Sequence, residues 1–227
     1  MDNALLLHGG LFLAEMGSIF WLSRQTVNEL FFFLRTFIHQ ERVVFSLVSL
    51  LFFPGTILHE MAHFITALAL MLRVREITIF PKFHANYIKL GSVVYEKQDF
   101  VRGVLVGIAP IFAGLFFFWF VARFNLFPSD TLWLNMLITY LIFTISSTMF
   151  SSKQDLVDVV FILPLFLLIG GVVYIFNINL SFITHNGVVV DGLTSFLKEV
   201  NIYLGFSLIM NIGLLAVLKM MRQLMKK

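Results

Sequence analysis

The sequence predicts an all-α polytopic membrane protein, with about five to six transmembrane helices and a small β-hairpin at the membrane surface. The chain of 227 residues is 59% hydrophobic and 13% charged, whereas a soluble domain is under half apolar and about a quarter charged. Its apolar residues lie in runs of about 20, the length that crosses a bilayer as a helix. One segment between these runs has the Ile, Val, Thr and Tyr content of β-strands.

The first apolar run, residues 4–22, is interrupted by His8, two glycines and Glu15. It predicts a helix that either crosses the membrane or lies in its interface. Residues 26–40 mix Phe and Leu with charged side chains, a pattern typical of an amphipathic interfacial helix. The first residues lack a basic stretch and a small-residue cleavage site, so we expect no removable signal peptide.

The next segment, residues 43–72, is apolar apart from one polar motif. A straight helix of this length would measure about 45 Å, more than one crossing needs. Pro54 and Gly55 therefore predict a kinked crossing, or a short buried helix that leads into the motif helix. Residues 74–80 and 86–95 are rich in β-branched residues and predict a hairpin. Because bare strand edges are not tolerated in lipid, we place it at the membrane surface or against helices.

The remaining apolar runs predict further crossings, at 103–124, 131–150, 157–176 and 202–222. The first of these contains Pro110 and several glycines, whose spacing permits close approach of helices. Residues 177–201 are expected to form a loop.

We expect a single membrane-embedded domain over residues 1–227. Its parts are an N-terminal helical segment (1–42), a core (43–176, with the hairpin at 74–95) and a loop with the C-terminal helix (177–227). With the C-terminus in the cytoplasm, 11 of the 16 Lys and Arg residues fall on the cytoplasmic side, as the positive-inside rule requires. This predicts a multi-pass protein of the cell (cytoplasmic) membrane. The basic residues are confined to short segments between apolar runs, so we expect no nucleic-acid partner.

The polar motif is H-E-M-A-H, residues 59–63. His59 and His63 are four residues apart, so on a helix both project from one face and can reach one zinc ion about 2.0–2.1 Å away. Glu60 can reach a zinc-activated water without being a ligand, which is the H-E-x-x-H pattern of metallopeptidases. Ionisable groups inside a membrane need compensation, and a bound cation supplies it. We therefore expect one Zn²⁺ per chain, with Glu60 as general base.

A catalytic zinc usually has three protein ligands. Asp155 is the leading candidate for the third, because it follows two predicted crossings later at the membrane face nearest the motif. Asp158 lies three residues on and shares roughly the same helical face, so it is the alternative ligand. A third interpretation gives Asp155 no metal and places it at the N-terminus of helix 157–176, where the helix dipole favours a carboxylate.

These features together resemble the site-2 protease family of intramembrane zinc metalloproteases. The resemblance rests on "HEMAH" in a membrane helix, the strands of "ITIFPK" and "YIKLGSVVY", the helix "RGVLVGIAPIFAG" and an acidic residue near a later span, over roughly residues 45–176. It implies His59 and His63 as zinc ligands, Glu60 as base and a later Asp as third ligand. The family's Asn-x-x-Pro and Leu-Asp-Gly context is replaced here by "TMFSSKQDLVD", which indicates a divergent branch.

The resemblance also implies that the hairpin holds an unwound substrate strand by strand addition. The residues expected to contact it are Ile77, Ile79, Leu90 and Val93. The expected function is an intramembrane zinc metalloendopeptidase whose partners are a membrane protein or peptide substrate and the lipid bilayer. The alternatives are a proteolytically inactive relative acting as a membrane scaffold, chaperone or transport component, and an ion or proton pathway.

Overall fold

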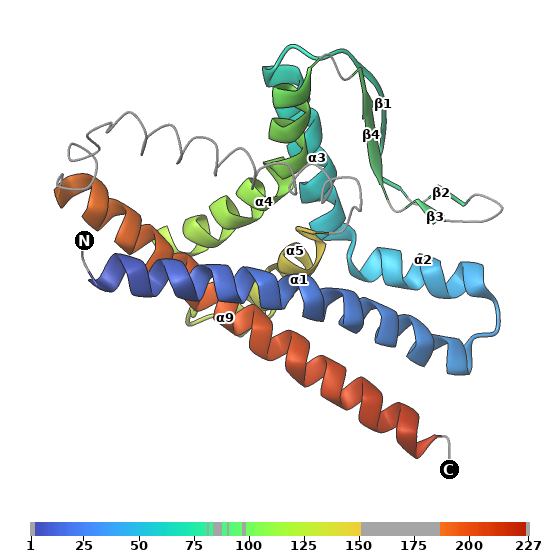
Figure 1. The fold of residues 1–227 in the computed structure, drawn as a ribbon. Coiled ribbons are helices and arrows are strands. Elements are labelled where there is room, and N and C mark those ends of the chain that lie inside the picture. The colour runs from blue at the N-terminus through green and yellow to red at the C-terminus, as the bar shows by residue number, and fades with distance from the viewer. Residues whose placement is uncertain are drawn as a thin grey trace.

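The computed structural model describes residues 3–80, 82–83, 88–89, 91–96, 99–150 and 187–225 of the chain. Over these residues the protein is mostly helical, with two small antiparallel sheets (Figure 1). The helices are α1 (Asn3–Phe37), α2 (Glu41–Leu51), α3 (Phe53–Ala69), α4 (Phe100–Arg123), α5 (Leu132–Thr148) and α9 (Gly187–Leu224). The strands are β1 (Val74–Thr78), β2 (Lys82–Phe83), β3 (Ile88–Lys89) and β4 (Ser92–Tyr95).

Three of the described helices, α1, α4 and α9, are long and apolar enough to cross a membrane. The bent pair α2–α3 makes a fourth if it is counted as one span. Helix α5 is apolar but has only 17 residues, slightly fewer than the usual 20 or so of a crossing. The predicted crossing at 157–176 lies outside the described residues, so the total of five to six remains a prediction.

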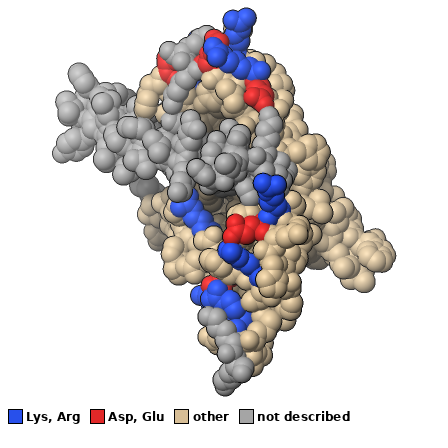
Figure 2. Space-filling model, turned by 90° about the vertical axis from the view of Figure 1, so that its right-hand side faces the viewer, with Lys and Arg blue, Asp and Glu red and all other residues tan. Residues whose placement is uncertain are grey.

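Charged side chains are grouped on the surface. On the face in Figure 2, the described Lys, Arg, Asp and Glu residues gather at the top and in the lower half, with uncharged surface beside them. Ion pairs join Arg75 to Glu96 across the hairpin (2.7 Å) and Arg222 of α9 to Glu29 of α1 (3.0 Å). This grouping agrees with a membrane protein, because lipid-exposed surface excludes charge.

Helix α1 is continuous over 35 residues, so the expectation that a new helix begins at residue 26 is wrong; an interfacial position of this segment stays a prediction. Every third or fourth residue in its middle is buried, namely Glu15, Ile19, Ser23, Thr26 and Leu30. Helix α9 packs along α1: Asn201 donates to the carbonyl of His8 at 3.0 Å, and Arg222 pairs with Glu29 further along. Glu29 is one of the polar residues that predicted an interfacial helix, and it is paired with a neighbouring helix instead.

Helix α9 begins at Gly187 and has 38 residues, so the loop expected at 177–201 is wrong from residue 187 onward. Val190 and Val200 are buried, and Phe196 packs against a hydrophobic cluster that contains Phe118 of α4 and Leu204 of α9. The polar and glycine residues between them obscure the helical periodicity of the sequence. Most of these residues lie on the exposed side of α9. Figure 1 shows α1 and α9 side by side and running in the same direction.

A bend of 72° separates α2 from α3. It lies at Phe52, two residues before Pro54, so the predicted break in this segment is confirmed. Pro54 occupies the first turn of α3, where its missing N–H leaves no helical hydrogen bond unmade. Tyr140 of α5 donates its hydroxyl to the carbonyl of Leu51 at 2.7 Å. The bond satisfies one of the acceptors at the end of α2.

The hairpin predicted directly after the motif helix is also confirmed. Strand β1 pairs antiparallel with β4, with Ile77 opposite Val93 and Thr78 opposite Ser92, and β2 pairs with β3 beyond them. Both β1 and β4 contact α3, and Figure 1 shows the hairpin beside the upper part of that helix. The strands are therefore held next to the motif.

Candidate metal centre on helix α3

Two histidines of α3 bring their ring nitrogens together inside the protein. His59 and His63 are 3% and 7% exposed. Their Nε2 atoms are 3.1 Å apart, because residues four apart lie on one helical face. Two nitrogen ligands of a tetrahedral zinc, each about 2.0–2.1 Å from the metal, are about 3.3 Å apart. The pair therefore fits two coordination positions of one zinc ion.

The ring of His63 is oriented from helix α4. Its Nδ1 and the carbonyl oxygen of Val106 are 2.8 Å apart. A carbonyl oxygen only accepts, so Nδ1 carries the proton of the neutral ring and donates, and Nε2 keeps its lone pair. Metal-binding histidines commonly donate their second nitrogen to a carbonyl or carboxylate in this way. His63 thus has the tautomer that can bind a metal through the nitrogen nearest His59.

Glu60 is buried beside the histidines, with 6% of its surface exposed. Its side chain lies against Gly91, the residue before β4: a Cβ built there would be 2.6 Å from Oε1 and 2.7 Å from Cγ of Glu60. None of the described glycines has a positive φ, so Gly91 is required for space rather than for its backbone conformation. Our sequence analysis missed this residue, although a glycine within a strand pattern signals a close approach.

Helix α5 packs on α3 one turn before the motif. The contact is at Gly55, where a Cβ would collide with the carbonyl oxygen of Thr144 and the hydroxyl of Thr148. Thr148 is the last residue of α5, and Asp155 follows it by seven positions. The chain that leads to Asp155 therefore starts beside the motif helix.

The described residues contain no group of three His, Cys, Asp or Glu side chains placed to hold a metal ion. Among the described residues, the candidate ligands that lie close together are the two histidines, His59 and His63. Asp155 and Asp158, the two candidates for the third ligand, lie outside the described residues. The choice between them stays a prediction.

The residues expected to contact substrate lie on the hairpin. Ile77 and Val93 are partners in the β1–β4 register, and Ile79 directly follows β1. Leu90 lies outside the described residues. Within the part of the chain that is described, β1 and β4 pair only with each other. Each therefore has a second edge, the kind of edge to which a further strand can be added.

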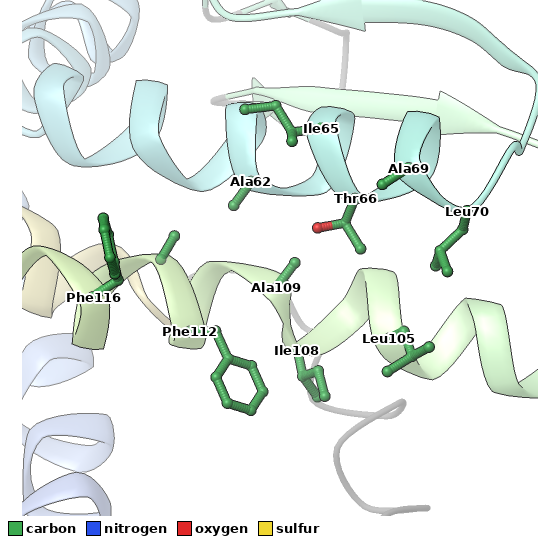
Figure 3. Close-up of a pocket in the computed structure, with 11 residues that line it drawn as sticks. Ala62, Ile65, Thr66, Ala69, Leu70, Leu105, Ile108, Ala109, Phe112 and Phe116 are labelled. Atoms are coloured by element: carbon green, nitrogen blue, oxygen red, sulfur yellow. The ribbon is translucent and has the colours of Figure 1, made fainter. Parts of the chain in front are cut away.

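An apolar groove of about 510 Å³ lies between α3 and α4 (Figure 3). Both helices contribute small and large side chains, among them Ala62 and Ile65 of α3 and Ala109 and Phe112 of α4. Neither histidine lines this groove. It is therefore separate from the histidine pair, and its chemistry suits hydrocarbon rather than a metal.

The structure thus brings together the two histidines predicted from the sequence, His59 and His63, and buries Glu60 on the same helix. It adds two contacts that the sequence analysis did not anticipate, the Val106 carbonyl and the space at Gly91. Comparisons of the chain with protein-family models, with curated proteins and with solved structures find no match.

Proposed function

We propose that this chain is an intramembrane zinc metalloendopeptidase, a divergent member of the site-2 protease family. It hydrolyses peptide bonds of membrane-embedded or membrane-proximal substrates. The observation that carries the proposal is the buried pair of Nε2 atoms 3.1 Å apart on an apolar helix, with Glu60 beside them. Three ionisable side chains inside a membrane protein are expensive, and such groups generally mark functional sites.

Each motif residue has a role in this reaction. His59 and His63 bind one zinc ion per chain, and Asp155 completes the protein ligands. When bound, the zinc supplies Lewis acidity, which polarises the peptide carbonyl and acidifies a water molecule. Glu60 accepts the proton of the attacking water and donates it to the leaving amine nitrogen. The Val106 carbonyl keeps His63 in the tautomer that binds through Nε2.

The hairpin orients the substrate. A peptide bond within a helix is shielded, so the substrate must be unwound before water can attack it. Adding the unwound segment to an edge of the β1–β4 sheet holds it extended through backbone hydrogen bonds. The predicted side-chain contacts are Ile77, Ile79, Leu90 and Val93. The packing of both strands on α3, with Gly91 touching Glu60, supports this arrangement.

The proposed topology has five to six crossings of the cell membrane and a cytoplasmic C-terminus. The segment 73–102, which carries the hairpin, then lies on the cytoplasmic side. The distribution of Lys and Arg supports this orientation. The partners are the surrounding lipid and a membrane protein or peptide that is cleaved.

Metal analysis of the purified protein tests the proposal. We expect about one zinc per wild-type chain and a near-complete loss of zinc in His59→Ala, because the motif supplies two of the ligands. His39→Ala is the matched control, since His39 is exposed between α1 and α2. Wild-type protein without zinc, or a His59→Ala variant that retains it, would contradict the proposal. The first result would favour an inactive relative acting as a scaffold, chaperone or transport component.

The third ligand can be identified by comparing two aspartate variants. Asp155 is seven residues beyond Thr148, so chain length alone keeps it within about 24 Å of the end of α5. We expect Asp155→Ala to weaken zinc binding by more than about tenfold, whereas Asp158→Ala binds normally. Zinc affinity is measured by competition with a chelator. The reverse pattern would assign the ligand to Asp158.

A further inference from the structure

Helix α4 contains a proline, Pro110, within its length rather than in its first turn. In an α-helix, the N–H of each residue donates to the carbonyl of the residue four positions earlier. Proline has no N–H, so at this position the bond to the carbonyl of Val106 cannot form. The proline ring also presses on that carbonyl, since an internal proline clashes with the residue four positions before it. The carbonyl of Val106 is therefore the one carbonyl in α4 that loses its helical hydrogen-bond donor because of Pro110.

That carbonyl is the one that His63 uses. His63 Nδ1 lies 2.8 Å from the Val106 oxygen, and both residues are buried, Val106 completely. A buried carbonyl without its helical donor needs another hydrogen-bond partner. The imidazole of the neighbouring helix provides it. The oxygen that lacks a hydrogen bond within α4 is thus the same oxygen that accepts a hydrogen bond from α3.

We propose that Pro110 is a positioning residue for the metal centre. By removing the helical donor and displacing the Val106 carbonyl from the helix axis, it makes this oxygen available to His63. The bond holds the His63 ring in place and holds the proton on Nδ1. The lone pair of Nε2 is then available on the side of the ring that faces His59, where a shared metal ion would bind. The inference rests on the proposed function only in taking the histidine pair as the zinc site.

Wild-type protein alone provides the first test. The full-length, metal-free chain is labelled with ¹⁵N-histidine, and the His63 signals are assigned from their disappearance in His63→Gln. We expect the neutral ring to carry its proton on Nδ1. A neutral ring that carries its proton on Nε2 would overturn the inference, whether or not the protein binds zinc or cleaves any substrate.

The second test restores the missing N–H. Pro110→Ala allows α4 to reclaim the Val106 carbonyl, so the Nδ1 proton of His63 loses its fixed acceptor. Loss of such an outer hydrogen bond typically weakens metal binding by about 10–100-fold. We expect a fall of that size in zinc affinity, measured by chelator competition, together with a mixture of His63 tautomers. Unchanged affinity and an unchanged tautomer would overturn the inference.

A matched double variant distinguishes the effect of freeing the Val106 carbonyl from the general effect of having a proline in the helix. Pro110→Ala/Ile111→Pro keeps one proline in α4 but removes the donor to Gly107 instead of Val106. We expect it to bind zinc as weakly as Pro110→Ala. Wild-type affinity in the double variant would show that only the presence of a proline matters, and would overturn the proposed role of the Val106 carbonyl. Thermal unfolding confirms that each variant is folded.

The outcomes also distinguish this inference from the proposed function. If wild-type protein binds no zinc, the proposed function fails, and the tautomer measurement still decides whether Pro110 orients His63. If wild-type protein binds zinc and Pro110→Ala binds it equally well, the inference fails and the proposed function stands.

Discussion

Glu60→Gln should lose peptide cleavage and keep its zinc. The glutamine amide has nearly the shape of the carboxyl group, so it fits the buried position against Gly91 without a new collision. It cannot accept the proton of the attacking water, because an amide is not a base near neutral pH. A positioned general base contributes about 10²–10⁴-fold to the rate. We expect a loss of that size with zinc content near that of wild type.

The measurement uses protein reconstituted in liposomes with a library of single-span membrane segments, whose new N-termini are identified by mass spectrometry. Glu15→Gln is the matched control. It neutralises another buried glutamate, which lies on α1 against Gly205 of α9 and away from the histidines. A Glu60→Gln variant that cleaves as fast as wild type would refute the assigned role of Glu60. Equal losses in both variants would indicate a general effect of changing a buried glutamate.

The local features of the fold were predictable because short-range rules govern them. An apolar run that is too long for one crossing, with Pro-Gly inside it, indicates a break, and the structure has a 72° bend there. A β-branched segment between apolar runs indicates a hairpin, and β1 pairs with β4. The errors concern α1 and α9, where polar residues predicted a separate interfacial helix and a loop. In α1 the error comes from a partner far away in the sequence, as in the pair of Glu29 with Arg222. In α9 it comes from polar and glycine residues that lie mostly on the exposed side of the helix.

The candidate site likewise has features that could be predicted from the sequence and features that could not. The histidine pair could be predicted, because residues four apart on a helix lie on one face whatever surrounds them. The Val106 carbonyl could not be predicted, since a backbone oxygen carries no residue-specific signal and lies 43 positions from His63 in the sequence. Gly91 carried a signal, the glycine inside a strand pattern, but only the structure identifies Glu60 as its neighbour.

Gly91→Ala should impair catalysis through Glu60 and leave zinc binding largely intact. The added methyl group would lie 2.6 Å from Oε1 and 2.7 Å from Cγ of Glu60, well inside contact distance. The atoms in its way belong to the Glu60 side chain and not to the backbone, so we expect the side chain and its carboxyl group to shift. A misplacement of about 1 Å in a catalytic group can cost about 10²-fold in rate. We expect a loss of cleavage of that size.

A double-mutant cycle distinguishes displacement of Glu60 from a general disturbance of the hairpin. Glu60→Asp keeps a Cγ atom, so the collision with the alanine methyl remains, but it already withdraws the carboxylate from the position that Gly91→Ala disturbs. In the Gly91→Ala background, Glu60→Asp should therefore cost far less than it costs in the wild-type background, because substitutions that act on the same group are not additive. Gly213→Ala is the control, since a Cβ there meets nothing within 4 Å. Wild-type cleavage by Gly91→Ala, or strictly additive losses in the double variant, would contradict this account. Losses that are smaller than additive in the double variant would show that Gly91 sets the position of the general base from the strand beside it.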